Sequence, residues 1–215
     1  NEGGGFFIDS TARGGLSGPT FQPLSWGVDL LDFDNDGDLD LALANGHIYP
    51  QADQLADRYG GYGFHAKNQL FRNNGRARFE EVTDAAGPGF AVARASHGLA
   101  SGDLDNDGDQ DLVVTVMGGV VIASNEGNQR FQIREVVPIN EDPSSLVAFD
   151  YDLDGRLDIY VCLYYPNQLF TDSEVIANGP TRSRFVYHDA NDGAANSLLR
   201  NEISADAGWQ FRDVT

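Results

Sequence analysis

The sequence predicts an all-β fold, a β-propeller-type array of four-stranded blades with three complete blades and one extra strand. Three observations predict this architecture. A turn-forming Asn followed by a Phe recurs in four segments, each unit contains two strand–turn–strand patterns, and an acidic nine-residue loop appears three times at the same point of the unit. No segment has the periodicity of an amphipathic helix. We therefore expect residues 1–215 to form a single repeat array.

The recurring turn sets the phase of the repeat. Asn and Gly both tolerate positive φ, so Asn-x-Gly is typical of a tight turn between two strands. The Phe follows the Asn by six residues in three copies and by ten in the fourth: Asn1 and Phe7, Asn73 and Phe79, Asn125 and Phe131, Asn201 and Phe211. The fourth copy therefore carries a short insertion.

This phase divides the chain into blades at residues 24–83, 96–136 and 144–215. Residues 1–23 remain as a leftover outer strand, at residues 6–11, and a linker. Propellers typically close with 4–8 blades, so three blades are too few for a ring. We expect a partial propeller that is completed by further repeats or by pairing of residues 6–11 with another chain.

Apolar residues alternate within the expected strands. Three leucines alternate over residues 39–43 and four apolar residues alternate over residues 157–163, as in half-buried strands. Cys162 is the single cysteine of the chain, so no intrachain disulfide forms, and we expect its thiol to be buried and inert. Insertions at residues 49–67 and 165–195 lengthen the first and third blades.

The three acidic loops have the same residue pattern. Positions 1, 3, 5 and 9 are Asp and position 6 is Gly, which permits a sharp turn. Alternate side chains of a curled loop converge on one centre, and position 7 offers its backbone carbonyl. The predicted metal ligands are Asp32, Asp34, Asp36, Asp38 and Asp40 in loop 1, Asp103, Asp105, Asp107, Asp109 and Asp111 in loop 2, and Asp150, Asp152, Asp154, Arg156 and Asp158 in loop 3, with Asp38, Asp109 and Arg156 acting through the carbonyl.

The chemistry of these ligands indicates calcium. All are hard oxygens, five or more per loop, which suits the 6–8 oxygen ligands of Ca²⁺, whereas zinc and copper favour His or Cys. Position 12, where an EF-hand carries Glu, is Leu43, Val114 or Val161, each inside an expected strand. We expect three calcium ions, each pinning one hairpin, and sites that act independently because they share no ligands.

Charge and hydropathy argue against nucleic acid binding and against a membrane span. The formal net charge is −19, and the sequence has no basic stripe that could displace counterions from nucleic acid phosphates. No run of 18 apolar residues is present, so no membrane span is expected.

Five segments carry a resemblance to known proteins: residues 26–37, 44–50, 68–73, 96–105 and 187–193. They resemble the FG-GAP/VCBS repeats of integrin α-chain propellers, and are more similar to the ASPIC/UnbV-associated family, the bacterial relatives of cartilage acidic protein. The resemblance implies a calcium-loaded, extracellular or cell-surface propeller of about seven blades. It implies adhesion, scaffolding or partner binding and no catalysis. The chain departs from this family in lacking its C-terminal ASPIC-like segment.

Two other functions remain open. One is a subunit of an extracellular fibre or lattice. The other is the propeller part of a glycan-processing enzyme with paired carboxylates. No catalytic residue is predicted, because His47, His65, His97 and His188 are scattered and no Ser or Cys nucleophile motif accompanies them.

The expected partner is a protein or a glycan at the extracellular surface, including copies of the chain itself. Aromatic residues on loops are typical of such contacts. In the first insertion they are Tyr49, Tyr59, Tyr62 and Phe64, which we interpret as the best candidates for partner contact.

Overall fold

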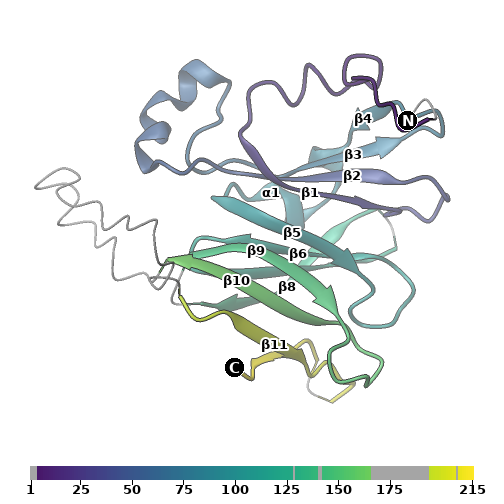
Figure 1. The fold of residues 1–215 in the computed structure, drawn as a ribbon, viewed down its shortest axis with the longest axis vertical. Helices are drawn as coiled ribbons and strands as arrows, with labels where there is room; N and C mark the ends of the chain where they lie inside the picture. Colours follow the sequence, from purple (N-terminus) through teal and green to yellow (C-terminus); the bar gives the residue numbers. More distant parts are fainter. Residues whose placement is uncertain (1–3, 128, 140–141, 166–193, 207) are drawn as a thin grey trace, which may run out of the picture.

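The computed structural model describes residues 4–127, 129–139, 142–165, 194–206 and 208–215. Three four-stranded antiparallel sheets follow one another along the long axis of the molecule (Figure 1). The predicted all-β array of four-stranded, blade-like sheets is confirmed.

Each sheet pairs strands that are consecutive in the chain. Blade 1 contains β1 (Ser25–Leu31), β2 (Asp40–Asn45), β3 (Gln69–Asn73) and β4 (Phe79–Glu81); blade 2 contains β5 (Ser96–Gly102), β6 (Asp111–Val116), β7 (Gly119–Asn125) and β8 (Phe131–Pro138); blade 3 contains β9 (Asp142–Phe149), β10 (Asp158–Tyr165), β11 (Ser197–Asn201) and β12 (Phe211–Asp213). The acidic loops join the first and second strands of each blade, and the Asn turns join the third and fourth. All three acidic loops lie along one edge of the stack (Figure 1, right).

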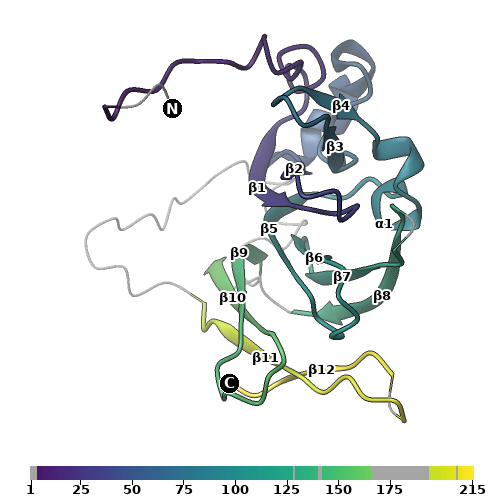
Figure 2. The ribbon, with the colours of Figure 1, turned by 90° about the vertical axis from the view of Figure 1, so that its right-hand side faces the viewer.

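The first strands of the blades lie side by side, β5 between β1 and β9 (Figures 1 and 2). Glycine permits this close approach. A Cβ placed on Gly27 of β1 would lie 2.5 Å from the backbone oxygen of His97, and one on Gly98 of β5 would lie 2.9 Å from the Cα of Ser145. Backbone therefore packs against backbone where the blades converge.

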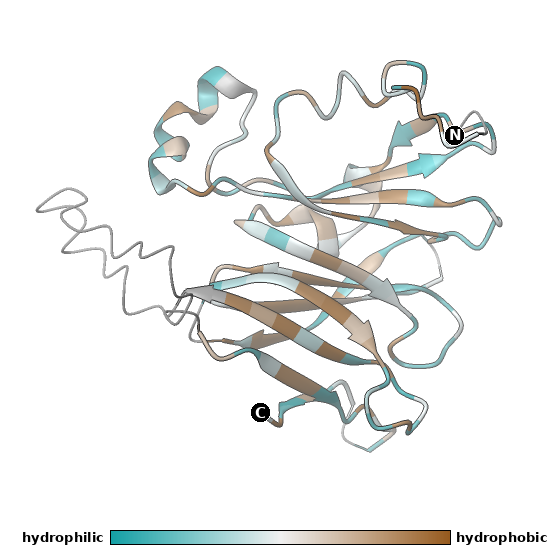
Figure 3. Ribbon diagram, viewed as in Figure 1, coloured by the Kyte–Doolittle hydropathy of each residue, from teal (hydrophilic) through white to brown (hydrophobic). Residues whose placement is uncertain are grey.

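Hydrophobic residues occur on the strands of all three blades (Figure 3). Their buried side chains form one cluster between blades 1 and 2 and another between blades 2 and 3. Between blades 1 and 2 the buried residues include Ala42, Leu70, Leu112 and Phe131. Between blades 2 and 3 they include Val113, Ile122, Ile159, Val161 and Leu199. The second residue of loops 1 and 2 belongs to these cores, because Phe33 is 2% exposed and Leu104 is fully buried. The packing between blades thus anchors the start of each of these two loops.

The expectation of half-buried strands is wrong for β2. All six of its residues are buried. Leu41 and Leu43 pack with Phe71 on one face, while Ala42 and Ala44 face blade 2. A blade has neighbours on both faces, so both faces of its second strand can be apolar; on the outer face of blade 1 the neighbour is Leu16 from the N-terminal segment.

Two local expectations also differ from the structure. Residues 6–11 do not form a strand, and Phe6 and Phe7 are 74% and 79% exposed, because no strand of the described chain pairs with them. Short helical turns are present at η1 (Pro50–Tyr59), η2 (Thr83–Ala85) and α1 (Pro88–Ala91). Pro50 at the first turn and Gly60, with φ of 66°, delimit η1, so the first insertion folds locally.

Cys162 is exposed, which contradicts the expectation of a buried thiol. Its neighbours Val161 and Leu163 in β10 point into the core, so Cys162 lies on the opposite face, which no other blade of the described chain covers. Most of the second insertion, residues 166–193, lies outside the described residues. Within the described ranges, no helix is long and apolar enough to cross a bilayer.

Candidate metal centres

The three acidic loops curl in the same way. Position 4 has a positive φ in each loop, 57° at Asn35, 60° at Asn106 and 62° at Leu153, and the Gly at position 6 has φ of 85–95°. Asn adopts the left-handed region more easily than other non-glycine residues, so Asn at position 4 favours this turn in loops 1 and 2. Asn at position 4 is thus a sequence signal for this turn in addition to the Asp and Gly pattern.

Backbone N–H groups hold the carboxylates of positions 1 and 5. In loop 1 the two carboxylate oxygens of Asp32 accept hydrogen bonds from the N–H groups of Asp36 and Gly37, both at 3.0 Å. The N–H of Asp38 donates to Oδ1 of Asp36 at 2.9 Å. The same three bonds recur in loops 2 and 3 at 2.9–3.1 Å. These bonds hold the carboxylate oxygens of positions 1 and 5 in place while the loop turns back around them.

The Asp at position 9 is buried at the base of each loop. Asp40, Asp111 and Asp158 are at most 1% exposed. In loop 2 the carboxylate of Asp111 accepts hydrogen bonds from the N–H of Leu104 at 2.8 Å and from the N–H of Asn125 at 2.9 Å. Burial raises the pKa of Asp111 to about 7 and that of Asp40 to about 6, because desolvation disfavours the charged form. A bound cation would offset this cost.

The carboxylates converge as a cation site requires. Three of them in each loop place one oxygen each within 4.8 Å of the others: Asp32, Asp34 and Asp36 in loop 1, Asp103, Asp105 and Asp111 in loop 2, and Asp150, Asp152 and Asp158 in loop 3. The predicted ligands at positions 1 and 3 meet in every loop. The roles predicted for the other positions, including the carbonyls of Asp38, Asp109 and Arg156, stay predictions.

Two oxygens of this group have no hydrogen-bond donor. They are Oδ1 of Asp34 and Oδ1 of Asp105, both at position 3 and both buried. Burial, and then the neighbouring carboxylates, raises the pKa of each of these two groups. Buried polar atoms normally have a partner, so these unpartnered oxygens fit a divalent cation, and an all-oxygen set fits calcium.

Loops 1 and 2 contact each other across the blade boundary. The side-chain amide of Asn125 donates to the carbonyl of Phe33 at 2.7 Å, and Asn201 makes the equivalent bond to Leu104 at 2.8 Å. Two bonds join loops 1 and 2 directly, from the side-chain amide of Asn35 to Asp109 and from the N–H of Asp32 to Gln110. A third bond reaches loop 1 from the β7–β8 turn, where Gln129 donates to Asp34. The predicted independence of the sites rests on their separate ligands. Because these bonds link loops 1 and 2, we expect calcium binding in one of them to influence the other.

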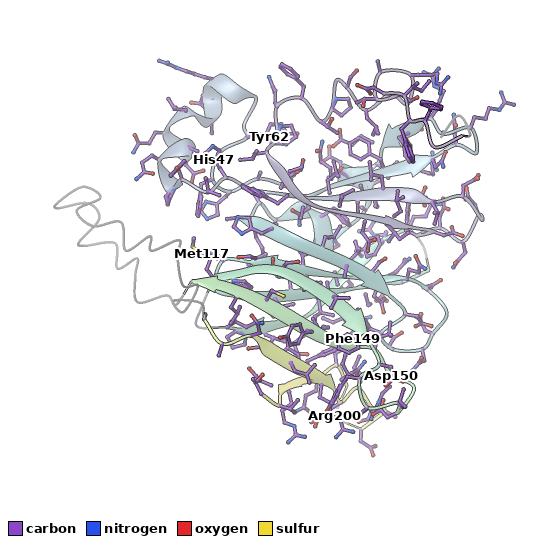
Figure 4. All side chains as sticks on the ribbon, in the orientation of Figure 1. His47, Tyr62, Met117, Phe149, Asp150 and Arg200 are labelled. Atoms are coloured by element: carbon purple, nitrogen blue, oxygen red, sulfur yellow. The ribbon has the colours of Figure 1, made fainter. Side chains whose placement is uncertain are left out.

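A groove of about 620 Å³ lies at the opposite end of blade 1 from its acidic loop, between residues 21–24 and the first insertion (Figure 4). Tyr49 and Tyr62 line it, and the rings of His47 and Tyr49 are 5.7 Å apart. Phe64, another predicted contact residue, is only 5% exposed, and its ring meets that of His65 edge-on. The side chain of Tyr59 is outside the described structure.

The three described histidines have different local partners. Nδ1 of His47 accepts a hydrogen bond from the N–H of Tyr49, Nδ1 of His65 lies 3.0 Å from a carboxylate oxygen of Asp53, and the ring of His97 packs against Trp26. His188 lies outside the described residues.

The sheets and loops define the class of protein: a β-propeller-type repeat protein with an acidic loop in each blade. The family model for the FG-GAP-like repeat matches residues 52–114 and 103–161, half of the chain, and the chain belongs to this family. It is also 26% identical over 174 residues to cartilage acidic protein 1 of mouse and of human, covering 74% of this chain and 23% of each relative. The chain thus spans about a quarter of their length, and the resemblance seen in the sequence is confirmed.

Proposed function

We propose that this chain is a calcium-binding repeat module of an extracellular protein, with one Ca²⁺ in each acidic loop. The observation that carries the proposal is the pair of buried, unpartnered oxygens of Asp34 and Asp105, each aimed at further carboxylates. The Asp residues at positions 1, 3, 5 and 9 would hold the ion. When bound, the ion supplies positive charge to carboxylates that otherwise repel one another.

The role of the ion is structural. The Asp at position 9 begins the second strand of the blade and is also bonded to the third strand, since Asn125 donates to Asp111 and Asn201 donates to Asp158. Holding this Asp and the loop on one ion fixes three strands and, in loops 1 and 2, the core residue at position 2. Calcium would therefore stabilise each blade and its contact with the next.

An extracellular location would supply enough calcium to fill the three loops. Extracellular calcium modules work at dissociation constants of roughly 10⁻⁴–10⁻³ M, and the loops are open to solvent at Asp36 and Asp107. FG-GAP-like repeats are generally modules of the adhesion type, and this favours adhesion, scaffolding or partner binding over catalysis. The groove beside Tyr49 and Tyr62 is the surface we propose for a protein or glycan partner.

A second candidate function is a subunit of a larger propeller, fibre or lattice. Val28 and Leu30 of β1 are 62% and 52% exposed, beside Leu43 and Leu41 on the outer face of blade 1. At the other end, Val147 of β9 is 49% exposed and lies next to Tyr160. Both end faces could pack against a further blade. Sedimentation at increasing concentration tests self-assembly; a monomer at every concentration would exclude assembly from copies of this chain alone.

Thermal unfolding tests the calcium proposal. We expect the melting temperature to rise by many degrees when calcium is added to chelated protein, because each empty loop gathers like charges. Magnesium at the same concentration should have a much smaller effect, since it retains its water and prefers fewer protein ligands. Equal melting temperatures in calcium and in chelator would refute the proposal.

A further inference from the structure

Loop 3 differs from loops 1 and 2 in its charge. Loops 1 and 2 each contain five Asp, whereas loop 3 contains four and has Arg156 at position 7. Nη2 of Arg156 lies 2.6 Å from Oδ2 of Asp154, and Nε donates to the same oxygen at 3.2 Å. One oxygen of a predicted ligand is therefore already occupied by a cation that belongs to the loop.

A second guanidinium reaches loop 3 from the neighbouring strand. Nη2 of Arg200, in β11, lies 2.8 Å from Oδ2 of Asp152 and 3.5 Å from Oδ2 of Asp154. Figure 4 shows Arg200 close to Asp150 at the acidic edge of blade 3. The side chain of Arg200 is 32% exposed, so this ion pair is less screened than one on an open surface.

The register of the strands explains why Arg200 turns to the loop. Its counterpart in blade 1, Arg72, stands opposite Glu80 and pairs with it at 3.4 Å. Arg200 instead stands opposite Arg212, and Arg212 pairs with Glu202 at 2.7 Å. Like charges opposite each other on neighbouring strands repel. The carboxylates of loop 3 are the acidic partners that remain for Arg200.

The ion pair of Arg200 changes the surroundings of the carboxylate at position 3. In loops 1 and 2, Oδ1 of Asp34 and of Asp105 is buried and has no donor. In loop 3, Asp152 is exposed and is paired with Arg200. The four Asp of loop 3 with its two guanidinium groups carry a net charge of −2, against −5 for the five Asp of loop 2.

We propose that Arg156 and Arg200 make loop 3 the low-affinity calcium site of the three, and that it fills only after loops 1 and 2. The inference rests on the proposed function of the loops. The two guanidinium groups compete with calcium for oxygens of Asp152 and Asp154, and the number of ligand charges sets calcium affinity. The same ion pairs keep loop 3 folded at calcium concentrations that leave it empty, so blade 3 depends least on the ion.

The residue at position 2 provides a probe for loop 3 alone. It is Tyr151 in loop 3, but Phe33 and Leu104 in the other loops. Terbium(III) can replace calcium at oxygen sites, and a nearby tyrosine excites its luminescence over short distances only. Terbium emission excited through tyrosine, and lost in Tyr151→Phe, therefore reports on loop 3. Titration calorimetry with calcium reports on all three loops together.

The test compares the wild type with the double variant Arg156→Asp, Arg200→Gln. Calorimetry of the wild type should give two tight sites and one at least tenfold weaker. Terbium emission through tyrosine should rise only after about two equivalents of terbium have bound, because loop 3 fills last. In the double variant the third site should tighten by about tenfold or more, because two guanidinium groups no longer compete for its carboxylates and the loop becomes more negative. Lys67→Gln is the control: it removes a cation that pairs with Asp84, outside the three acidic loops, and leaves both ion pairs of loop 3 in place.

Arg200→Lys is a second variant, which keeps the charge and should keep the third site weak. Circular dichroism in saturating calcium verifies that each variant is folded. Three equal affinities, or a third affinity unchanged in a folded double variant, would overturn this inference and leave the proposed function standing. Absence of calcium binding at every loop would overturn both.

Discussion

Asn125→Ala tests how much the contact between two blades contributes to stability. The side chain of Asn125 is 1% exposed and its amide donates to the carbonyl of Phe33 in loop 1. Its Oδ1 also accepts the N–H of Gly127 at 3.2 Å. Substitution by Ala removes both bonds and leaves the buried carbonyl of Phe33 without this donor.

The loss can be estimated from these contacts. The bond to Gly127 contributes about 1 kcal/mol, and a buried carbonyl left without a partner costs about 1–3 kcal/mol. We expect the free energy of unfolding to fall by about 2–4 kcal/mol in saturating calcium. Asn73 is the matched control, since it makes the same turn bond, to Gly75, but its amide bonds within its own blade, to the carbonyl of Leu39.

Urea unfolding of both variants measures the difference. Asn73→Ala should cost about 1 kcal/mol for its turn bond, because water can replace the exposed bond to the carbonyl of Leu39. The two variants should therefore differ by about 1–3 kcal/mol at an unchanged slope. Calcium binding to loops 1 and 2 should also weaken in Asn125→Ala alone. Equal destabilisation by the two substitutions would show that the bond between blades contributes nothing.

Three further predictions concern single positions. Leu153→Asn should raise the free energy of unfolding, measured in urea, by up to about 1 kcal/mol. Leu153 is 88% exposed and has φ of 62°, a conformation that Asn adopts at lower cost. An unchanged free energy of unfolding would show that the backbone at this position is not strained. In calcium-free protein, burial raises the pKa of Asp111 to about 7, so the folded state binds a proton that the unfolded state releases near pH 4. Urea midpoints should therefore fall as the pH rises from about 4 to about 7. A rise of the midpoint over that range would contradict the burial argument. Gly98→Ala should destabilise the protein by about 1–3 kcal/mol through overpacking between β5 and β9. Gly18→Ala is the control, because its new methyl group meets open space. Equal melting temperatures of the two variants would exclude the close approach of β5 and β9.

The repeat phase of the sequence was enough to predict the blades. Hairpins around residues 69–83 and 145–163 appear in the structure because alternating apolar residues and turn residues act locally. What the sequence did not reveal depends on neighbours in space. The exposure of Cys162 and the lack of a strand at residues 6–11 are both decided by which face or edge another blade covers.

The candidate site was predictable because its ligands lie within one short loop. The Asp-x-Asp-x-Asp-Gly pattern brings together positions 1 and 3 in every blade without help from distant residues. Arg200 is different, since it lies 48 residues after Asp152 and reaches it only through the register of β11. Asn125 likewise reaches Phe33 through the packing of two blades. A pattern search along the chain cannot detect such partners.

Calcium stoichiometry tests the central claim most directly. Isothermal titration of chelated protein, with the calcium content of the saturated protein measured by atomic absorption, counts the sites. We predict three ions per chain, falling to two in Asp105→Ala, which removes the position-3 ligand of loop 2. Fewer than two ions per wild-type chain, or the same number in Asp105→Ala, would contradict the claim that these loops are calcium sites.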